Sequence, residues 1–534
     1  MRWKPPASNV VQNNSFGGEM VHLDVVIVGA GMGGLMAGAL LAQRGRRVLV
    51  VEAADRIGGY QCRLESGDFS IEPHFHFLQD AGPGRPVRRL LDELGIGLEW
   101  ERVDPLVEFT FPDRRFAIPV ERADFIDMLE RDFPAEISGI ERLFATTRAI
   151  HQAARRLPAL APVLVRHGGD TVDDLTSRFV TDPALKTIVG GWAAYFGYGT
   201  DQISALAIAT FTEACFDGGV LHPCGGITSL ADALRTSIES NSGVVLLASS
   251  VQRIDVAAGR VTGVALTNGD RIEAPMVIST LDASTTFGKL IAGDSPAAAL
   301  VQRLETVDRF RSPFSVFLAV RADALRIDGR SPVQVVFPGY DTSDQDRAQL
   351  AGEVERAPVS LGIPTLMNPQ LAPAGHHIVL LYTFLARERI EMLLADESQA
   401  RALAHRLVRT AERGLPGLEH GAVAMITSTS AMRGIYTPMT GGELGWAPTP
   451  AVLTGGKVAA RALRNPLIAA VGAAAARIAP DFVARCAART SVPGPTTPVR
   501  GLFLAGQWTR NGAGINNVFA SACDAVAAIE SATA

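Results

Sequence analysis

A glycine-rich stretch near the start of the chain has the residue types and spacing of a phosphate-binding turn. Gly29, Gly31 and Gly34 form a G-x-G-x-x-G pattern, with Gly33 inside it, between an apolar β-branched run and a helix-forming run. In such a turn the first glycine permits a tight bend, the second lets the backbone approach a pyrophosphate, and the third allows close helix–strand packing. The helix N-terminus adds amide donors and partial positive charge. The pattern predicts a dinucleotide site.

An acidic residue and a second pair of glycines follow this turn. Glu52 ends the next apolar run, where a carboxylate is expected to accept hydrogen bonds from ribose hydroxyls. The same carboxylate would repel a 2′-phosphate, so NADP is disfavoured. Arg56, Gly58 and Gly59 come directly after it in EAADRIGGY. Glycines suit a segment whose backbone lies close against a cofactor.

This Glu-x5-Gly-Gly arrangement resembles the extended FAD fingerprint of the amine oxidase and phytoene desaturase superfamily, which favours FAD over NAD. LHPCGGITSLADAL (221–234) is similar to the Pro-x-Gly-Gly turn of that superfamily, and GLFLAGQWTRNGAGINNVFASA (501–522) is similar to its C-terminal FAD motif. MRGIYTPMTGGELGW (432–446) is similar to a stretch of the carotenoid isomerase and retinol saturase branch.

The resemblance implies further contacts with FAD. The backbone of Val251 would hold the adenine, and Gly506 and the turn at Gly512, Gly514 and Ile515 would lie beside the isoalloxazine. Gln507 and Asn516 are further expected cofactor-binding residues of the same motif. The family usually has an acidic residue at the position of Gln507, where it accepts a hydrogen bond from the ribityl chain. An amide oxygen can accept the same bond, without the strength of a carboxylate.

The catalytic groups are less clearly marked. His74, with Glu72 and His76, lies where the family's chain passes near the flavin and could tune the flavin or shuttle a proton. The alternative is that these are ordinary hydrogen-bonded residues at a domain seam. We expect no metal site, because His74 and His76 lack further ligands at a familiar spacing. Cys62 is not expected to hold the flavin covalently, since amine oxidases that do so use a C-terminal cysteine.

The resemblance also implies the reaction: an FAD-dependent oxidoreductase acting on C–H or C=C bonds of an elongated apolar, isoprenoid-like substrate, by desaturation or isomerisation. Trp192, Tyr195 and Phe196 in GGWAAYFGYG are candidates to line the substrate site, with ordinary core packing as the alternative. A flavin amine oxidase remains an alternative activity. A flavin-free protein similar to the prenyl-binding GDP dissociation inhibitors is the non-enzymatic alternative.

The elements that must position these residues indicate an α/β fold. LDVVIVG, GMGGLMAGALLAQRG and RRVLVVE read as strand, helix and strand, the opening of a doubly wound parallel sheet. Residues 85–212 read as mostly helical, and 244–281 as hairpins returning to the sheet. We expect a Rossmann-like FAD-binding domain interleaved with an α+β substrate-binding domain. The predicted FAD-binding parts are 21–84, 215–300 and 485–534, and the predicted substrate-binding parts are 85–214 and 301–484.

The composition limits the kinds of binding partner that the chain can have. The formal net charge of −5 gives no pull toward nucleic acid, and five dispersed cysteines form no disulfide framework, which fits a reducing cytosol. Residues 1–20 read as a flexible tail without the apolar core of a signal peptide. Peripheral membrane contact stays open. The sequence contains no second strand-G-x-G-x-x-G-helix unit that could bind a nicotinamide, so we do not expect NADH or NADPH to reduce the flavin. The expected electron acceptor is a quinone or dioxygen.

Overall fold

The computed structural model describes residues 22–74, 77–156, 162–291, 298–431, 443–453 and 492–533. The predicted tail, His76, most of the 432–446 stretch and the alanine-rich run 457–488 lie outside the described residues. Across the described part of the chain, no helix is both long and apolar enough to cross a membrane.

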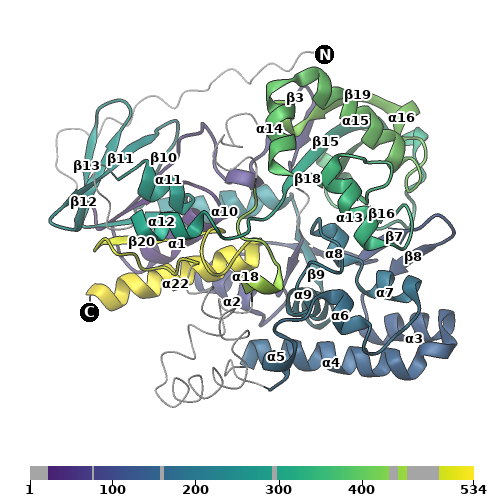
Figure 1. Ribbon diagram of the computed structural model, residues 1–534. Helices are drawn as coiled ribbons and strands as arrows, with labels where there is room; N and C mark the ends of the chain where they lie inside the picture. Colours follow the sequence, from purple (N-terminus) through teal and green to yellow (C-terminus); the bar gives the residue numbers. More distant parts are fainter. Residues whose placement is uncertain are drawn as a thin grey trace.

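A five-stranded parallel sheet forms the layer that carries the glycine-rich turn (Figure 1). Its strands, in spatial order, are β10 (Val244–Leu246), β2 (Val48–Val51), β1 (Val25–Val28), β14 (Met276–Ser279) and β20 (Leu502–Leu504). The central strand β1 pairs in parallel with β2 and β14, and all four of its residues are buried. Burial on both faces is typical of parallel strands covered by helices. The predicted strand-helix-strand opening is confirmed.

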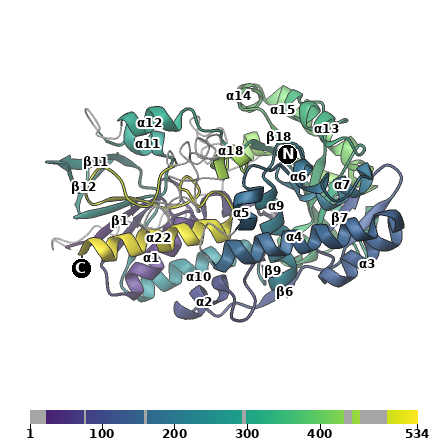
Figure 2. The same cartoon turned by 60° about the horizontal axis from the view of Figure 1, so that its bottom comes forward.

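Helices α1 (Met32–Gln43), α10 (Ile227–Ser240) and α22 (Ile515–Thr533) pack together against this sheet (Figure 2). Helix α1 is buried along almost its whole length, which explains its lack of charged residues, and Gly45 follows its end with a positive φ. The short helices α2 (Pro86–Glu93), α11 (Ala283–Gly288) and α12 (Ala298–Leu304) complete this part.

The 244–281 segment differs in part from its prediction. Its outer strands, β10 and β14, join the parallel sheet as expected. Between them, β11 (Val251–Ala257), β12 (Arg260–Leu266) and β13 (Arg271–Glu273) form a separate antiparallel sheet. Their turns end at Gly259 and Gly269, which both have positive φ, so each strand folds back on its neighbour.

A seven-stranded mixed sheet forms the second large layer. In spatial order its strands are β19 (Ala422–Thr427), β15 (Ser312–Arg321), β18 (His376–Leu385), β17 (Val359–Gly362), β16 (Val333–Val336), β7 (Val107–Thr110) and β8 (Arg115–Ile118). The apolar runs PFSVFLAV and HHIVLLYTFLA form the antiparallel pair β15 and β18. The hairpin β7–β8 lies in the region that was expected to be mostly helical. The sequence did not predict it, because these short strands are stabilised by the pairing of β7 with the distant β16.

Helices cover both faces of this sheet. One face carries α13 (Thr342–Ala351), α14 (Arg387–Ala395), α15 (Glu397–Ala411), α16 (Leu418–Gly421) and α17 (Ser428–Ala431). The helices from the earlier part of the chain are α3 (Arg122–Asp132), α4 (Ile137–Arg156), α5 (Pro162–His167), α6 (Val172–Thr176), α7 (Pro183–Val189), α8 (Trp192–Tyr195) and α9 (Ala205–Gly218). Alternation along β15 divides the two cores: Val316 packs in the core with Leu407, whereas Phe317 belongs to the core that contains Trp192.

Smaller elements join the layers. They are the hairpin β3 (Leu64–Ser66) and β4 (Phe69–Ile71), the sheet of β5 (Leu78–Gln79), β9 (Val220–Pro223) and β6 (Trp100–Arg102), and helix α18 (Pro450–Leu453). Short 3-10 turns occur at Gly59–Gln61, Pro134–Glu136, Ala322–Ala324, Pro364–Leu366 and Pro369–Leu371. All strands of the parallel sheet lie in the segments predicted to bind FAD, and all strands of the seven-stranded sheet lie in the other segments. The domain boundaries themselves stay a prediction.

Candidate functional site

Two glycines of the G-x-G-x-x-G turn are required by packing. Gly29 has a φ of 102°, and a Cβ at this position would lie 2.3 Å from Oγ1 of Thr280. A Cβ on Gly34 would lie 2.0 Å from the carbonyl oxygen of Gly29. The amide of Gly29 donates to the carbonyl of Val51 at 2.8 Å, which ties the turn to the next strand. These glycines therefore shape the turn, as the spacing predicts.

Gly31 differs because it faces open space. A Cβ placed on Gly31 would meet nothing within 4 Å, and its φ of −68° is open to any residue. It is the N-cap of α1, and no side chain caps this helix end. The second glycine pair lies against it: a Cβ on Gly59 would be 3.2 Å from Cα of Gly31, and the amide of Gly58 donates to the carbonyl of Ala30 at 2.9 Å. A helix N-terminus without a side-chain cap, beside open space, fits a pyrophosphate.

Glu52 connects the turn to the segment predicted to hold the adenine. Its carboxylate accepts the amide of Ala30 at 2.7 Å and the amide of Ala54 at 2.8 Å, one bond to each oxygen. Each oxygen keeps a further lone pair for a ribose hydroxyl. The carbonyl of Glu52 accepts the amide of Ser249 at 2.8 Å, and Val251 begins β11 two residues later. This brings Val251 and Glu52 to one end of the site, although their contacts with FAD stay predictions, as does a role for Arg56.

The C-terminal motif packs directly on the glycine-rich turn. A Cβ on Gly33 would lie 3.1 Å from Cα of Gly506, whose amide donates to Oγ of Ser521 at 3.0 Å. Gly514 precedes α22 with a φ of 96°, and the side-chain amide of Asn516 donates to the carbonyl of Gln79 at 2.8 Å.

Helices α1 and α22 therefore begin on either side of one contact between the two motifs. Neither helix has an acidic residue in its first turn, so its positive end is not compensated there. Two such helix ends suit a negatively charged cofactor. The predicted flavin-side residues are thus brought together, whereas the individual role of Gln507 or Ile515 stays a prediction.

His74 and Glu72 occupy different surroundings. Burial lowers the pKa of His74 to about 4, so its imidazole is neutral at neutral pH and is a poor proton donor there. The ring of His74 meets the ring of Tyr60 edge-on, with centroids 5.8 Å apart. Burial raises the pKa of Glu72, whose carboxylate lies 3.4 Å from the amide and hydroxyl of Thr228. The contact ties β4 to α10 and fits the structural alternative for Glu72.

A charged cluster that sequence reasoning missed lies beside the C-terminal motif. Glu443 is 5% exposed and pairs with Arg309 at 3.2 Å and Arg387 at 3.4 Å. The indole of Trp446 donates to the carbonyl of Trp508 at 3.0 Å, and the two rings meet edge-on at 5.2 Å. Glu443 and Trp446 lie in the stretch 432–446 described above, but their partners are distant in sequence. The guanidinium of Arg309 also lies over the ring of Trp508 at 5.8 Å, so these contacts connect the C-terminal motif to the segment before β15 and to the start of α14.

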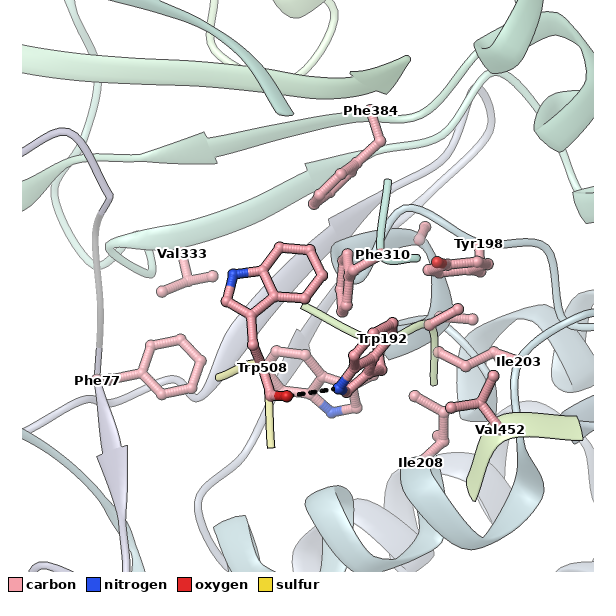
Figure 3. Close-up of a cluster of buried hydrophobic side chains, with 14 of the residues drawn as sticks. Phe77, Trp192, Tyr198, Ile203, Ile208, Phe310, Val333, Phe384, Val452 and Trp508 are labelled. Carbon is pink, nitrogen blue, oxygen red and sulfur yellow. Dashed lines mark hydrogen bonds between the residues drawn. The ribbon is translucent and has the colours of Figure 1, made fainter. Parts of the chain in front are cut away.

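Aromatic side chains fill the region between the C-terminal motif and α8 (Figure 3). Figure 3 shows Phe77, Trp192, Phe310, Phe384 and Trp508 gathered in one buried region, although they come from distant parts of the chain. Of the three predicted substrate residues, Trp192 is 3% exposed and belongs to the core. Tyr195 and Phe196 keep partly accessible surface.

The three predicted substrate residues do lie together. The ring of Tyr195 is 5.4 Å from that of Trp192 and 5.7 Å from that of Phe196. Phe211 from α9 packs against both Trp192 and Phe196 at 4.9 Å. We call Phe77, Trp192, Tyr195, Phe196 and Phe211 the aromatic cluster. Its role in binding a substrate stays a proposal.

Several known proteins are similar to this chain. Residues 32–414 match the family model described as flavin containing amine oxidoreductase. Prolycopene isomerase 1 of an Oncidium hybrid cultivar is 25% identical over 80% of this chain and 76% of its own length. All-trans-retinol 13,14-reductase of Danio rerio is 27% identical over 59% of this chain and 57% of its own. An oxidoreductase from Methanosarcina mazei has the same fold, with a TM-score of 0.62 and 18% identity over 94% of this chain and 99% of that chain.

The family match covers most of the chain, and the residues described above fit its cofactor. Three features lie near the start of α1: the open space beside Gly31, the Glu52 carboxylate with its remaining lone pairs, and the N-termini of α1 and α22. The chain is therefore an FAD-dependent oxidoreductase and belongs to the flavin containing amine oxidoreductase family.

Proposed function

We propose that this protein acts on C–H or C=C bonds of an elongated apolar polyene, by desaturation or by flavin-assisted isomerisation. The observation that carries the proposal is the aromatic cluster, whose Phe77 and Trp192 are buried together with Trp508 of the C-terminal motif (Figure 3). The names of the relatives support it, because one is a prolycopene isomerase and another reduces a double bond of all-trans-retinol. Burial of each methylene contributes about 0.8 kcal/mol, so a long apolar chain can bind with few polar contacts.

FAD supplies hydride transfer when it is bound. The residues of this chain then have three tasks: to hold the cofactor, to align an apolar substrate and to exclude water. The rings of the aromatic cluster suit the second and third tasks, because they offer large rigid apolar faces. The neutral state of His74 at neutral pH fits a site that needs no charged acid or base.

Two alternatives are less well supported. A flavin amine oxidase shares the family, but the curated relatives named above are named for polyenes and not for amines. A flavin-free prenyl-binding protein would not need the open face at Gly31 or the Glu52 carboxylate beside it. Both features, and a match to a flavin containing family, favour the enzyme.

The electron path is part of the proposal. We infer that a quinone or dioxygen accepts electrons if the reaction is a net oxidation, since the chain has a single G-x-G-x-x-G unit in a strand-helix context. Anaerobic mixing with NADH or NADPH should leave the flavin band unchanged on the time scale of turnover. Fast bleaching by either nucleotide would contradict this path. Substrates of this class reside in membranes, so we also expect transient bilayer contact, measurable by flotation with liposomes.

The substrate class is tested by product analysis. Holoprotein is incubated with a panel of linear C20 to C40 polyenes, with and without oxygen atoms, and with small primary amines, and products are separated by chromatography. We expect conversion of at least one polyene and no conversion by protein stripped of FAD. Faster turnover of an amine than of any polyene would overturn the proposal.

A further inference from the structure

Residues 443–447, which we call the bridging segment, contact two of the motifs that are expected to hold FAD. On one side, the hydroxyl of Tyr60, which directly follows the second glycine pair, donates to the backbone carbonyl of Glu443 at 3.3 Å. On the other side, the indole of Trp446 donates to the carbonyl of Trp508 in the C-terminal motif at 3.0 Å. The bridging segment therefore joins two motifs that lie near opposite ends of the sequence.

The middle of the bridging segment packs on the backbone of Gln507. Gly445 has a φ of 115°, and a Cβ at this position would lie 2.7 Å from the carbonyl oxygen of Gln507. Glycine suits both this φ and such a close approach. The family usually has an acidic residue where this chain has Gln507, and an amide makes a weaker hydrogen bond to the ribityl chain than a carboxylate. The bridging segment thus fixes the backbone of a residue whose side chain is expected to hold FAD less firmly.

Backbone hydrogen bonds anchor the bridging segment to the chain that leads into β15. The amide of Phe310 donates to the carbonyl of Gly445 at 2.7 Å, and the amide of Ala447 donates to the carbonyl of Asp308 at 3.0 Å. The ring of Phe310 lies in the buried aromatic region that Figure 3 shows. The bridging segment is therefore held from the side of the seven-stranded sheet, and not by the FAD motifs alone.

Glu443 adds charged contacts to this anchor. Its buried carboxylate pairs with Arg309 at 3.2 Å and with Arg387 at 3.4 Å. The guanidinium of Arg309 in turn lies over the ring of Trp508, 5.8 Å from its centroid. Removing one partner of a buried ion pair leaves an uncompensated charge, which is strongly unfavourable. The side chain of Glu443 therefore fixes Arg309 and, through it, the C-terminal motif.

We propose that the bridging segment retains FAD by linking the C-terminal motif to the second glycine pair, and that Glu443 is its positioning residue. Contacts that must open before a ligand leaves act mainly on the dissociation rate and much less on the association rate. The inference thus concerns the lifetime of the complex with FAD. It does not depend on the substrate, so it is tested separately from the proposed function.

The test measures how fast FAD leaves the holoprotein when an excess of a second apoflavoprotein captures the released cofactor. The stability of the FAD-free protein is measured in parallel by urea unfolding. Glu443→Gln keeps the shape of the side chain and removes its charge, and we expect FAD to leave at least about tenfold faster. Trp446→Phe removes only the N–H group that binds the carbonyl of Trp508, and we expect release to be about two- to tenfold faster.

Two matched controls separate retention of FAD from general stability. Glu108→Gln alters a second buried carboxylate, which pairs with Arg330 at 2.9 Å in the seven-stranded sheet, and should destabilise the FAD-free protein without faster release of FAD. Trp100→Phe removes an indole N–H that has no hydrogen-bond partner among the described residues, and should leave release unchanged.

Two results would overturn the inference. The first is release at the wild-type rate in both Glu443→Gln and Trp446→Phe. The second is equal acceleration in Glu443→Gln and Glu108→Gln, which would show that any loss of a buried charge loosens the cofactor. If Glu443→Gln does not fold, the comparison of Trp446→Phe with Trp100→Phe decides: equal release rates in these two variants would also overturn it.

Discussion

Replacing Gly31 by alanine should separate cofactor binding from folding. The new methyl group would meet no protein atom within 4 Å, and the backbone at this position, with φ −68° and ψ 173°, is ordinary for alanine. We therefore expect the free energy of unfolding of the FAD-free protein to change by no more than about 0.5 kcal/mol. The methyl group would instead occupy the open space at the start of α1, where the pyrophosphate of FAD is expected.

The loss of affinity can be estimated from the contacts at this helix end. A displaced pyrophosphate would lose at least one hydrogen bond to a charged group, which contributes about 1.5–3 kcal/mol. This corresponds to FAD binding that is weaker by roughly 10- to 150-fold. FAD-free protein would be titrated with FAD and followed by flavin fluorescence, and its stability would be measured by urea unfolding.

Two further alanine variants make this experiment decisive. Gly97→Ala also places a methyl group where nothing lies within 4 Å, but away from the site, and should leave both FAD affinity and stability unchanged. Gly34→Ala would bring its Cβ to 2.0 Å from the carbonyl oxygen of Gly29 and should destabilise the FAD-free protein by about 1–3 kcal/mol or more. Wild-type FAD affinity in Gly31→Ala would refute the placement of the pyrophosphate. A loss of stability like that of Gly34→Ala would show that the space beside Gly31 is not open.

Three other variants or conditions test the remaining assignments. Glu52→Gln should weaken FAD binding by about tenfold, because an amide loses the charge-assisted bonds to the Ala30 amide and to ribose; calorimetry showing unchanged affinity would argue against the ribose assignment. As pH falls from about 6.5 to about 4, His74 takes up a proton in the unfolded chain but not in the folded protein. The free energy of unfolding of the wild type, measured in urea, should therefore fall more steeply over this range than that of His74→Gln. Parallel curves would contradict the lowered pKa. FAD should be fully released by acid precipitation, because Cys62 is 1% exposed and burial raises its pKa to about 11; yellow colour in the pellet would show a covalent bond.

Features set by local sequence were predictable, and features set by distant pairing were not. The turn at Gly29 and the helix α1 follow from glycine spacing and an adjacent apolar run, and the structure contains both. The hairpin β7–β8 was missed because its short strands depend on β16, more than two hundred residues later. For the same reason nothing in the sequence joined Glu443 to Arg309. Residue type alone also could not separate Trp192, which is buried in the core, from Tyr195, which keeps accessible surface.

The central claim is that the flavin and an apolar polyene react at one site, and anaerobic titration of the FAD-loaded protein tests it most directly. The visible spectrum of the flavin and the composition of the polyene would be recorded together after each addition. We predict a perturbed flavin band with every polyene that is converted, bleached in step with a new double bond in desaturation, or unbleached with a changed isomer ratio in isomerisation. An unperturbed flavin and an unchanged polyene, with bleaching by a small amine in the same experiment, would contradict the account.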